Sequence, residues 1–171
     1  KNTARLKRLI DELMDFRKLE INKFSIKVSE MEAIAFVKEI AGHFEEEAVL
    51  KNIVFQVESD DLPITLWSDP SMLEKIIFNI LSNAFKNTPD NGEITVGVIR
   101  CNHKVSFPLL YGEETVQALE IYVHDTGSGI KREEIVKVFE RFYQVENMNS
   151  QYYGGTGIGL EVVKNFVDLL K

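Results

Sequence analysis

The chain has 171 residues, of which 44% are hydrophobic and 27% charged; this balance is typical of a globular protein and excludes a disordered or collagen-like chain. No apolar stretch reaches the ~18 residues of a membrane-spanning helix, and the excess of 27 acidic over 20 basic residues argues against nucleic-acid binding. The single cysteine, Cys101, excludes an internal disulfide and a multi-thiolate metal site, so we expect a reducing compartment.

Residues 1–23 have the spacing of an amphipathic helix, with apolar side chains at steps of three and four. Such a helix needs a partner for its apolar stripe. It is either a further core helix of the same domain or part of a helical bundle whose other members lie elsewhere. Because the chain begins at Lys1 rather than Met and ends at Lys171 within a helical pattern, we expect a piece of a longer protein.

The next segment combines short strands with a helix. Alternation predicts strands over residues 24–28 and 53–58, and a further extended run over 62–67. Ser29 and Glu32 form a capping-box pattern, which predicts one helix from this point to about Lys51.

Residues 69–123 give the clearest local signals. Asp69 as the N-cap and Pro70 at the first helical position predict a helix that runs through Lys86 and ends before Pro89. A turn over 90–92 follows, and alternation then predicts strands over 93–100 and 116–123, which could form an antiparallel hairpin with a long connection. We therefore expect an α+β domain with helices on one face of a sheet and neighbouring strands antiparallel.

One face of the predicted 70–86 helix carries polar side chains. Asn79, Asn83 and Lys86 follow at steps of four and three, which places them together. Amide oxygens suit a Mg²⁺ shell and a lysine can meet phosphate, whereas a solvated face or a hydrogen-bonded structural pair explains the same residues.

Two Gly-rich loops lie in the last third of the chain, with a short helical segment predicted between them near 132–139. Asp125-Thr126-Gly127-Ser128-Gly129 follows a strand; its carboxylate could accept from an exocyclic amine, or simply form an Asx turn. Gly155-Thr156-Gly157-Ile158-Gly159 opens the final helix and could cradle a phosphate, or be a tight turn. It is not a Walker A loop, because no Lys-Ser or Lys-Thr follows its last glycine.

Taken in order, these segments correspond to the N, G1, F and G2 boxes of a known family, with Phe139-Glu140-Arg141-Phe142-Tyr143 as the F box. The chain resembles the catalytic ATP-binding domain of bacterial sensor histidine kinases, within the gyrase-, chaperone- and histidine kinase-like ATPases of the Bergerat fold. The resemblance implies a two-layer α/β sandwich with helices on one face of a mixed sheet, preceded by one long helix and lacking its C-terminal strands. It assigns residues 1–23 to the C-terminal helix and linker of a dimerisation and phosphotransfer domain, and residues 24–171 to a C-terminally truncated catalytic domain.

The resemblance also implies the cofactors, ATP and Mg²⁺, and the roles of the site residues. Asp125 would accept from the adenine amino group, Asn83 would coordinate Mg²⁺ with Asn79 beside it, and Lys86 would neutralise phosphate charge. Asn79 and Lys86 are thereby the candidate catalytic residues. The remaining nucleotide-binding candidates are Gly127, Gly129, Ile130, Gly155, Thr156, Gly157, Gly159 and Leu160. Residues 141–154 would form an ATP lid, with Phe139, Phe142 and Tyr143 anchoring its root.

Asn79 stands where the gyrase-like and chaperone ATPases have a general-base Glu, so the resemblance implies transfer to a protein histidine rather than to water. His43, His103 and His124 lack the sequence context of a phosphoacceptor. We therefore expect the acceptor on a dimerisation domain outside this chain, which alone would not autophosphorylate.

The further partners implied are a response regulator receiver domain and a second copy of a homodimeric parent. The expected location is the cytosolic portion of a membrane-anchored parent. Asn87 and Gln144 depart from the family pattern. The alternative is therefore a non-catalytic nucleotide-binding or protein-interaction module of the same fold.

Overall fold

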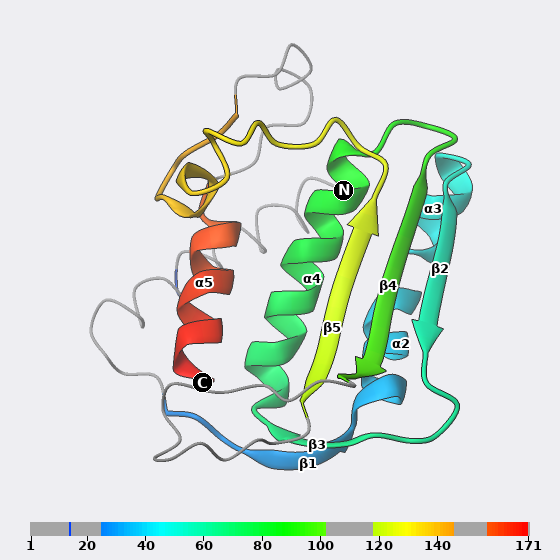
Figure 1. The fold of residues 1–171 in the computed structure, drawn as a ribbon, viewed down its shortest axis with the longest axis vertical. Coiled ribbons are helices and arrows are strands. Elements are labelled where there is room, and N and C mark those ends of the chain that lie inside the picture. Colours follow the sequence, from blue (N-terminus) through cyan, green and yellow to red (C-terminus); the bar gives the residue numbers. More distant parts are fainter. Residues whose placement is uncertain (1–13, 15–24, 102–117, 146–156, 171) are drawn as a thin grey trace. The chain divides into compact units, whose positions relative to one another are not determined.

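The computed structural model describes Met14 and residues 25–101, 118–145 and 157–170 (Figure 1). The chain divides into two compact units, a larger one over residues 28–129 and a smaller one that includes residues 130–170. The helix and linker predicted over 1–23 lie outside the described residues, except for Met14, which is helical and exposed.

A three-stranded sheet organises the larger unit, in the order β2-β4-β5. These strands span Val54–Ser59, Glu93–Arg100 and Leu119–Asp125. β4 and β5 pair antiparallel, as the alternation predicts, but most of their connection lies outside the described residues. The expectation that all neighbouring strands are antiparallel is wrong for β2 and β4, which pair parallel. A helix and a further strand lie between these two strands in the sequence, and such a crossover returns the chain to the end of the sheet where β2 began.

Three helices cover one face of this sheet: α2 (Ala33–Gly42), α3 (Glu45–Leu50) and α4 (Pro70–Asn87). Figure 1 shows α2 and α3 behind β2 and β4, and α4 running alongside β5. On the central strand, Ile94, Val96 and Val98 are 0% exposed and belong to the same buried cluster as the apolar residues of the helices. Because side chains alternate along a strand, these residues identify the covered face. The implied arrangement of helices on one face of a mixed sheet is confirmed.

The entry into α2 differs from the prediction. Residues 25–28 form no strand; β1 spans Ser29–Glu32 and pairs antiparallel with β3 (Thr65–Ser68). The pairing takes Ser29 into a strand, so Ser29 does not cap the helix. Glu32 is itself the N-cap, and its carboxylate accepts from the backbone N–H of Ile34 and of Ala35, at 3.1 and 2.6 Å.

The single helix predicted up to Lys51 is also wrong, because α2 ends at Gly42 and α3 begins at Glu45. Glycine is a poor helix former, and the break turns Phe44 into the core, where it is 5% exposed. Its ring stacks on Phe85 of α4 at a centroid distance of 5.1 Å. Burial of a large aromatic side chain therefore outweighs continuation of the helix.

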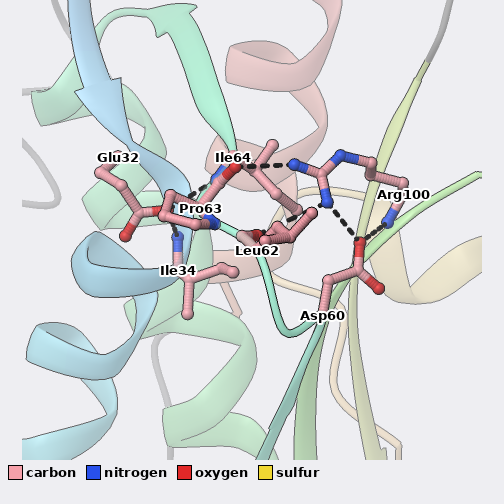
Figure 2. Close-up of polar contacts among 7 residues, drawn as sticks. All are labelled: Glu32, Ile34, Asp60, Leu62, Pro63, Ile64 and Arg100. Carbon is pink, nitrogen blue, oxygen red and sulfur yellow. Dashed lines mark hydrogen bonds and ion pairs between the residues drawn. The ribbon is translucent and has the colours of Figure 1, made fainter.

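Polar contacts tie the segment between β2 and β3 to its surroundings (Figure 2). The backbone N–H of Arg100 donates to Asp60 Oδ2 at 2.9 Å, and its guanidinium forms an ion pair with the same oxygen at 3.2 Å. The guanidinium also donates to the carbonyl of Pro63 at 2.6 Å, while Glu32 accepts from the backbone N–H of Ile64 at 2.9 Å. The β1–β3 pair is thus fixed to the end of β4.

The smaller unit contains a 3-10 turn, η1 (Lys137–Phe139), and the helix α5 (Gly159–Leu169). The short helical segment predicted near 132–139 consists of turns that end in η1. The predicted final helix is confirmed, and its buried residues are Val162, Val163 and Phe166. Within the described ranges, no helix is both long and apolar enough to cross a membrane.

Candidate functional site

Local signals position the helix that carries the predicted N box. Asp69 is 5% exposed, and its Oδ1 accepts from the backbone N–H of Ser71 and of Met72, at 3.0 and 3.2 Å. Pro70 occupies the first turn, where its missing N–H costs nothing. The helix ends at Asn87, as predicted from Pro89.

Asn79, Asn83 and Lys86 are all half-buried on this helix. In the described part of the chain, the side-chain amides of Asn79 and Asn83 have no hydrogen-bond partner. Leaving amides half-buried and unpaired costs free energy unless a ligand or water satisfies them. This observation favours a binding face over a hydrogen-bonded structural pair.

The donor chemistry of this face fits a hard cation held together with a phosphate. An amide oxygen is a suitable Mg²⁺ ligand, and Mg²⁺ usually keeps waters and takes substrate phosphate oxygens as further ligands. Among the described residues, no group of three or more His, Cys, Asp or Glu side chains could hold a metal ion by itself.

Asp125 is the last residue of β5 and pairs with Ile94 in the ladder. Val123 pairs with the buried Val96, so alternation places Asp125 on the face that the helices cover. Its Oδ1 accepts from the backbone N–H of Gly127 at 2.8 Å, which is the Asx turn that the sequence left open as one of two interpretations. Among the described residues, the Asp125 side chain forms no other hydrogen bond. Its second oxygen, Oδ2, can therefore still accept one.

The loop after Asp125 lies against the end of α4. A Cβ built on Gly127 would lie 2.8 Å from the carbonyl oxygen of Asn87 and 2.6 Å from Asp125 Oδ1, so only glycine fits there. Asn87 in turn donates from its side chain to the carbonyl of Asn83 at 2.7 Å. Figure 1 shows the ends of α4 and β5 and the start of β4 at the same end of the sheet. The fold thus brings the predicted G1 and N segments together.

The smaller unit joins the predicted F and G2 segments. Gly157 has φ +71°, and a Cβ there would lie 2.7 Å from the backbone of Phe142. The N–H of Phe142 donates to the carbonyl of Gly157 at 3.1 Å, and Arg141 forms an ion pair with Glu161 at 3.2 Å. These contacts hold the F segment against the start of α5.

Other predicted residues are placed as follows. Gly129 has φ +67° with open space around its Cβ position, and Ile130 is 47% exposed. Gly159 is the first residue of α5, and Leu160 is half-buried in its first turn. Gly155 and Thr156 lie outside the described residues, as does most of the predicted lid.

The F-box aromatics make different contacts. The ring of Phe142 is 64% exposed, and the residue is held through its backbone at φ +60°. Tyr143 donates from its hydroxyl to Glu134 at 3.1 Å. That these residues anchor a lid stays a prediction.

Sequence reasoning missed the threonines that surround the turn between α4 and β4. Thr88 is 3% exposed, and its buried hydroxyl has no hydrogen-bond partner among the described residues, which makes it available to an ordered water or a ligand. Thr126 hydrogen-bonds to Glu93 through both its backbone and its side chain. The surroundings of these two threonines have no sequence signal, because they depend on which strand end lies beside the turn.

Residues 68–171 match the model of the family described as histidine kinase-, DNA gyrase B-, and HSP90-like ATPase. Histidine kinase P4 of Formosa agariphila is 36% identical, over 97% of this chain and 11% of that protein. Sensor histidine kinase TmoS of Ectopseudomonas mendocina is 34% identical, over 99% of this chain and 16% of that protein. The chain thus spans only a small part of the curated relatives it matches.

Solved structures give the same fold. Full-length ShkA in complex with AMPPNP has a TM-score of 0.74 at 20% identity, over 96% of this chain and 31% of that one. The nucleotide-free catalytic domain of histidine kinase ThkA has a TM-score of 0.65 at 22% identity, over 83% of this chain and 82% of that one. At these identities the likeness shows the fold, which is that of histidine kinase catalytic domains.

Proposed function

Because this chain belongs to the family of histidine kinase-, DNA gyrase B- and HSP90-like ATPases, we propose that it is the ATP-binding catalytic domain of a sensor histidine kinase. The names of its relatives support this choice within the family. The observation that carries it is the contact of Gly127 with Asn87, because this contact sets the Asp125 carboxylate beside the helix that bears Asn83.

Asp125 recognises the base in this proposal. The backbone N–H of Gly127 donates to Asp125 Oδ1. The other oxygen, Oδ2, would accept from the exocyclic amino group of adenine. Guanine presents a carbonyl oxygen at the corresponding position, which would face the carboxylate without a proton between them. The carboxylate therefore selects ATP over GTP.

The polar face of α4 receives the phosphates. Mg²⁺, when bound, supplies neutralisation of the phosphate charge and orients the transferred group. The side-chain oxygen of Asn83 would hold the cation with Asn79 beside it, and the Lys86 ammonium would offset further phosphate charge. Local neutralisation is needed because the chain carries a net charge of −7.

The acceptor is a histidine of a separate phosphotransfer domain. Asn79 has no carboxylate with which to activate water, which favours transfer to a protein side chain over hydrolysis. By the resemblance, Gly157 and Gly159 at the start of α5 are further candidates for phosphate binding, since the first backbone N–H groups of a helix have no acceptor within the helix.

The remaining partners belong to the proposed parent protein. The parent is a homodimer whose phosphoryl group passes to a response regulator, and histidine kinase ThkA, a structural neighbour, has been solved in complex with response regulator TrrA. The resemblance further leads us to propose that the chain is a cytosolic part of a membrane-anchored parent.

Titration calorimetry with Mg-ATP and Mg-GTP tests the nucleotide site. We expect ATP to bind and GTP to bind far more weakly, and Asp125→Asn to weaken ATP binding by about 10- to 100-fold, which corresponds to loss of one hydrogen bond to a charged group. Asp90→Asn, in the exposed turn after α4, is the matched control and should bind ATP as the wild type does. The absence of ATP binding, or equal binding by the Asp125 variant, would contradict the proposal.

Transfer is tested separately, by incubating the parent kinase with ATP labelled in its γ-phosphate and analysing the product for acid-labile, base-stable phosphohistidine. ATP binding without labelled histidine would instead support the alternative, a nucleotide-binding module without kinase activity.

A further inference from the structure

We propose that Thr126 is a positioning residue of the nucleotide site: its hydroxyl locks the Asp125 loop to the start of β4 and thereby sets the adenine-binding carboxylate relative to the cation-binding helix. This inference rests on the proposed function. Thr126 belongs to the Gly-rich loop after β5, and the sequence predicts no role for its side chain.

The hydroxyl of Thr126 takes the place of its own backbone carbonyl. In an antiparallel sheet, a hydrogen-bonded pair of residues exchanges both N–H···O bonds. Beyond the last ladder pair, Ile94 and Asp125, the N–H of Thr126 still donates to the carbonyl of Glu93 at 3.1 Å. The return bond from the N–H of Glu93 goes to Thr126 Oγ1 at 2.9 Å. The carbonyl of Thr126 is thereby released, and the chain can leave the sheet at this residue.

The side chain of Thr126 also packs on the turn between α4 and β4. A Cβ built on Gly92 would lie 3.0 Å from Thr126 Oγ1, so a larger residue at 92 would collide with the hydroxyl. The same turn is held from its other side, because Val54 donates to the carbonyl of Gly92 at 2.9 Å. Thr126 therefore contacts a turn that is itself hydrogen-bonded to β2.

This turn leads directly back to the predicted cation-binding helix. Lys51 donates from its ammonium to the carbonyl of Phe85 at 2.5 Å and accepts, through its own carbonyl, from the N–H of Asn91 at 3.0 Å. The hydrogen bonds at Glu93, Asn91 and Lys51, together with the backbone of residues 91–93, thus connect Thr126 to the last turn of α4. Asn83 lies in the same last turns of that helix.

Core packing does not explain why residue 126 is a threonine, because Thr126 is exposed. Removing the hydroxyl would leave the N–H of Glu93 without its acceptor and free the loop to move off the turn. Asp125 and Gly127 would then lose their fixed place beside Asn87, and nucleotide would have to order the loop on binding. We expect an effect on affinity that exceeds any effect on folding.

Thr126→Val tests the proposal, since it keeps the branched shape and removes only the hydroxyl. Thr126→Ser keeps the hydroxyl and should restore binding. Thr95→Val is the matched control: Thr95 lies two residues beyond Glu93 on β4, pairs with His124, and its hydroxyl forms no hydrogen bond among the described residues. ATP affinity is measured by calorimetry in the presence of Mg²⁺, at a temperature where circular dichroism shows each variant to be folded.

We expect Thr126→Val to weaken ATP binding by about fivefold to tenfold, the equivalent of one or two lost hydrogen bonds, with Thr126→Ser and Thr95→Val close to wild type. Amide exchange at Glu93 should accelerate in Thr126→Val alone. Unchanged affinity in folded Thr126→Val, or an equal loss in Thr126→Ser, would overturn the inference while leaving the proposed function standing. If Thr126→Val does not fold, Thr126→Ala replaces it and the same comparison decides. Failure of the wild type to bind ATP overturns the proposed function and, with it, this inference.

Discussion

The ring of Tyr122 lies directly over Gly97, its cross-strand partner in the β4–β5 ladder. From there the Tyr122 hydroxyl reaches Glu58 on β2 and donates to its carboxylate at 2.5 Å. One side chain thus spans all the strands of the sheet β2-β4-β5, on the face opposite the helices. A Cβ on Gly97 would overlap the ring, so glycine is required for this arrangement.

Gly97→Ala should therefore displace the Tyr122 ring and destabilise the chain. We expect a loss of about 1–3 kcal/mol in the free energy of unfolding, the usual cost of overpacking, measured by urea denaturation. Gly42→Ala is the control, because no atom of the described residues lies within 4 Å of its Cβ position. A Gly97→Ala variant as stable as wild type would show that the ring does not depend on the glycine.

The same contact predicts a shifted tyrosine titration. The hydrogen bond to Glu58 raises the pKa of Tyr122 above its ordinary value of 10.0, with burial and the nearby carboxylates acting in the same direction. Because the neutral form is favoured in the folded state, this contribution to stability is complete below pH 10.0 and is lost as the pH rises through the raised pKa.

Glu58→Gln should move the pKa of Tyr122 back towards 10.0. The ultraviolet difference spectrum between wild type and Tyr122→Phe isolates this tyrosine among the 5 in the chain. An unaltered titration in Glu58→Gln would rule out the carboxylate as the cause.

The hydrogen bonds of Glu32 predict that the free energy of unfolding depends on pH in the opposite direction. The backbone N–H of Ile64 and then that of Ala35 hold the pKa of Glu32 below its ordinary value of 4.5. The charged form is favoured in the folded state, so the contribution is present above pH 4.5 and is lost as the pH falls through the lowered pKa. Glu32→Gln should lower Tm at neutral pH, and the difference from wild type should shrink in acid.

Glu30→Gln is the matched control, because Glu30 is an exposed residue of the same strand that pairs with Trp67 and caps no helix. Thermal unfolding followed by circular dichroism at a series of pH values makes the comparison. If the two variants lose Tm equally at neutral pH, the cap formed by Glu32 is not the cause.

The glycines of the two loops should differ in their tolerance of alanine. Gly157 combines a positive φ with overlap of a Cβ on the backbone of Phe142, whereas Gly129 has the positive φ alone. Left-handed backbone costs a non-glycine residue about 1–2 kcal/mol, so Gly129→Ala should lose about that amount and Gly157→Ala more. Equal losses of stability in the two variants, measured by urea denaturation, would contradict the contact between Gly157 and Phe142.

Local chemistry was sufficient for part of the fold and of the site. Asp69 and Pro70 predict the start of α4 because the cap is made with residues only two and three positions away. The Asx turn at Asp125 is local for the same reason. The alignment of Asn79, Asn83 and Lys86 follows from helix geometry alone, so the candidate site could be assembled as a set of residues before their arrangement was known.

The remaining features depend on partners far along the chain. β1 begins at Ser29 rather than Phe24 because β3 pairs there, and the helix breaks before Phe44 because its ring stacks on Phe85. β2 and β4 are parallel because β3 and α4 lie between them in the sequence and return the chain to the same end of the sheet. Thr126 contacts Glu93 only when β4 and β5 are paired in this register.

By itself, the sequence determined the capped helix, because the cap rests on backbone groups within a few residues. It left the Asx turn at Asp125 open as one of two interpretations. The order of the motifs along the chain indicated the family. Only the tertiary structure decided that Gly127 lies on Asn87 and that Thr126 fastens the loop to β4. Those contacts join segments separated by tens of residues, and they form where burial and strand pairing bring the chain together.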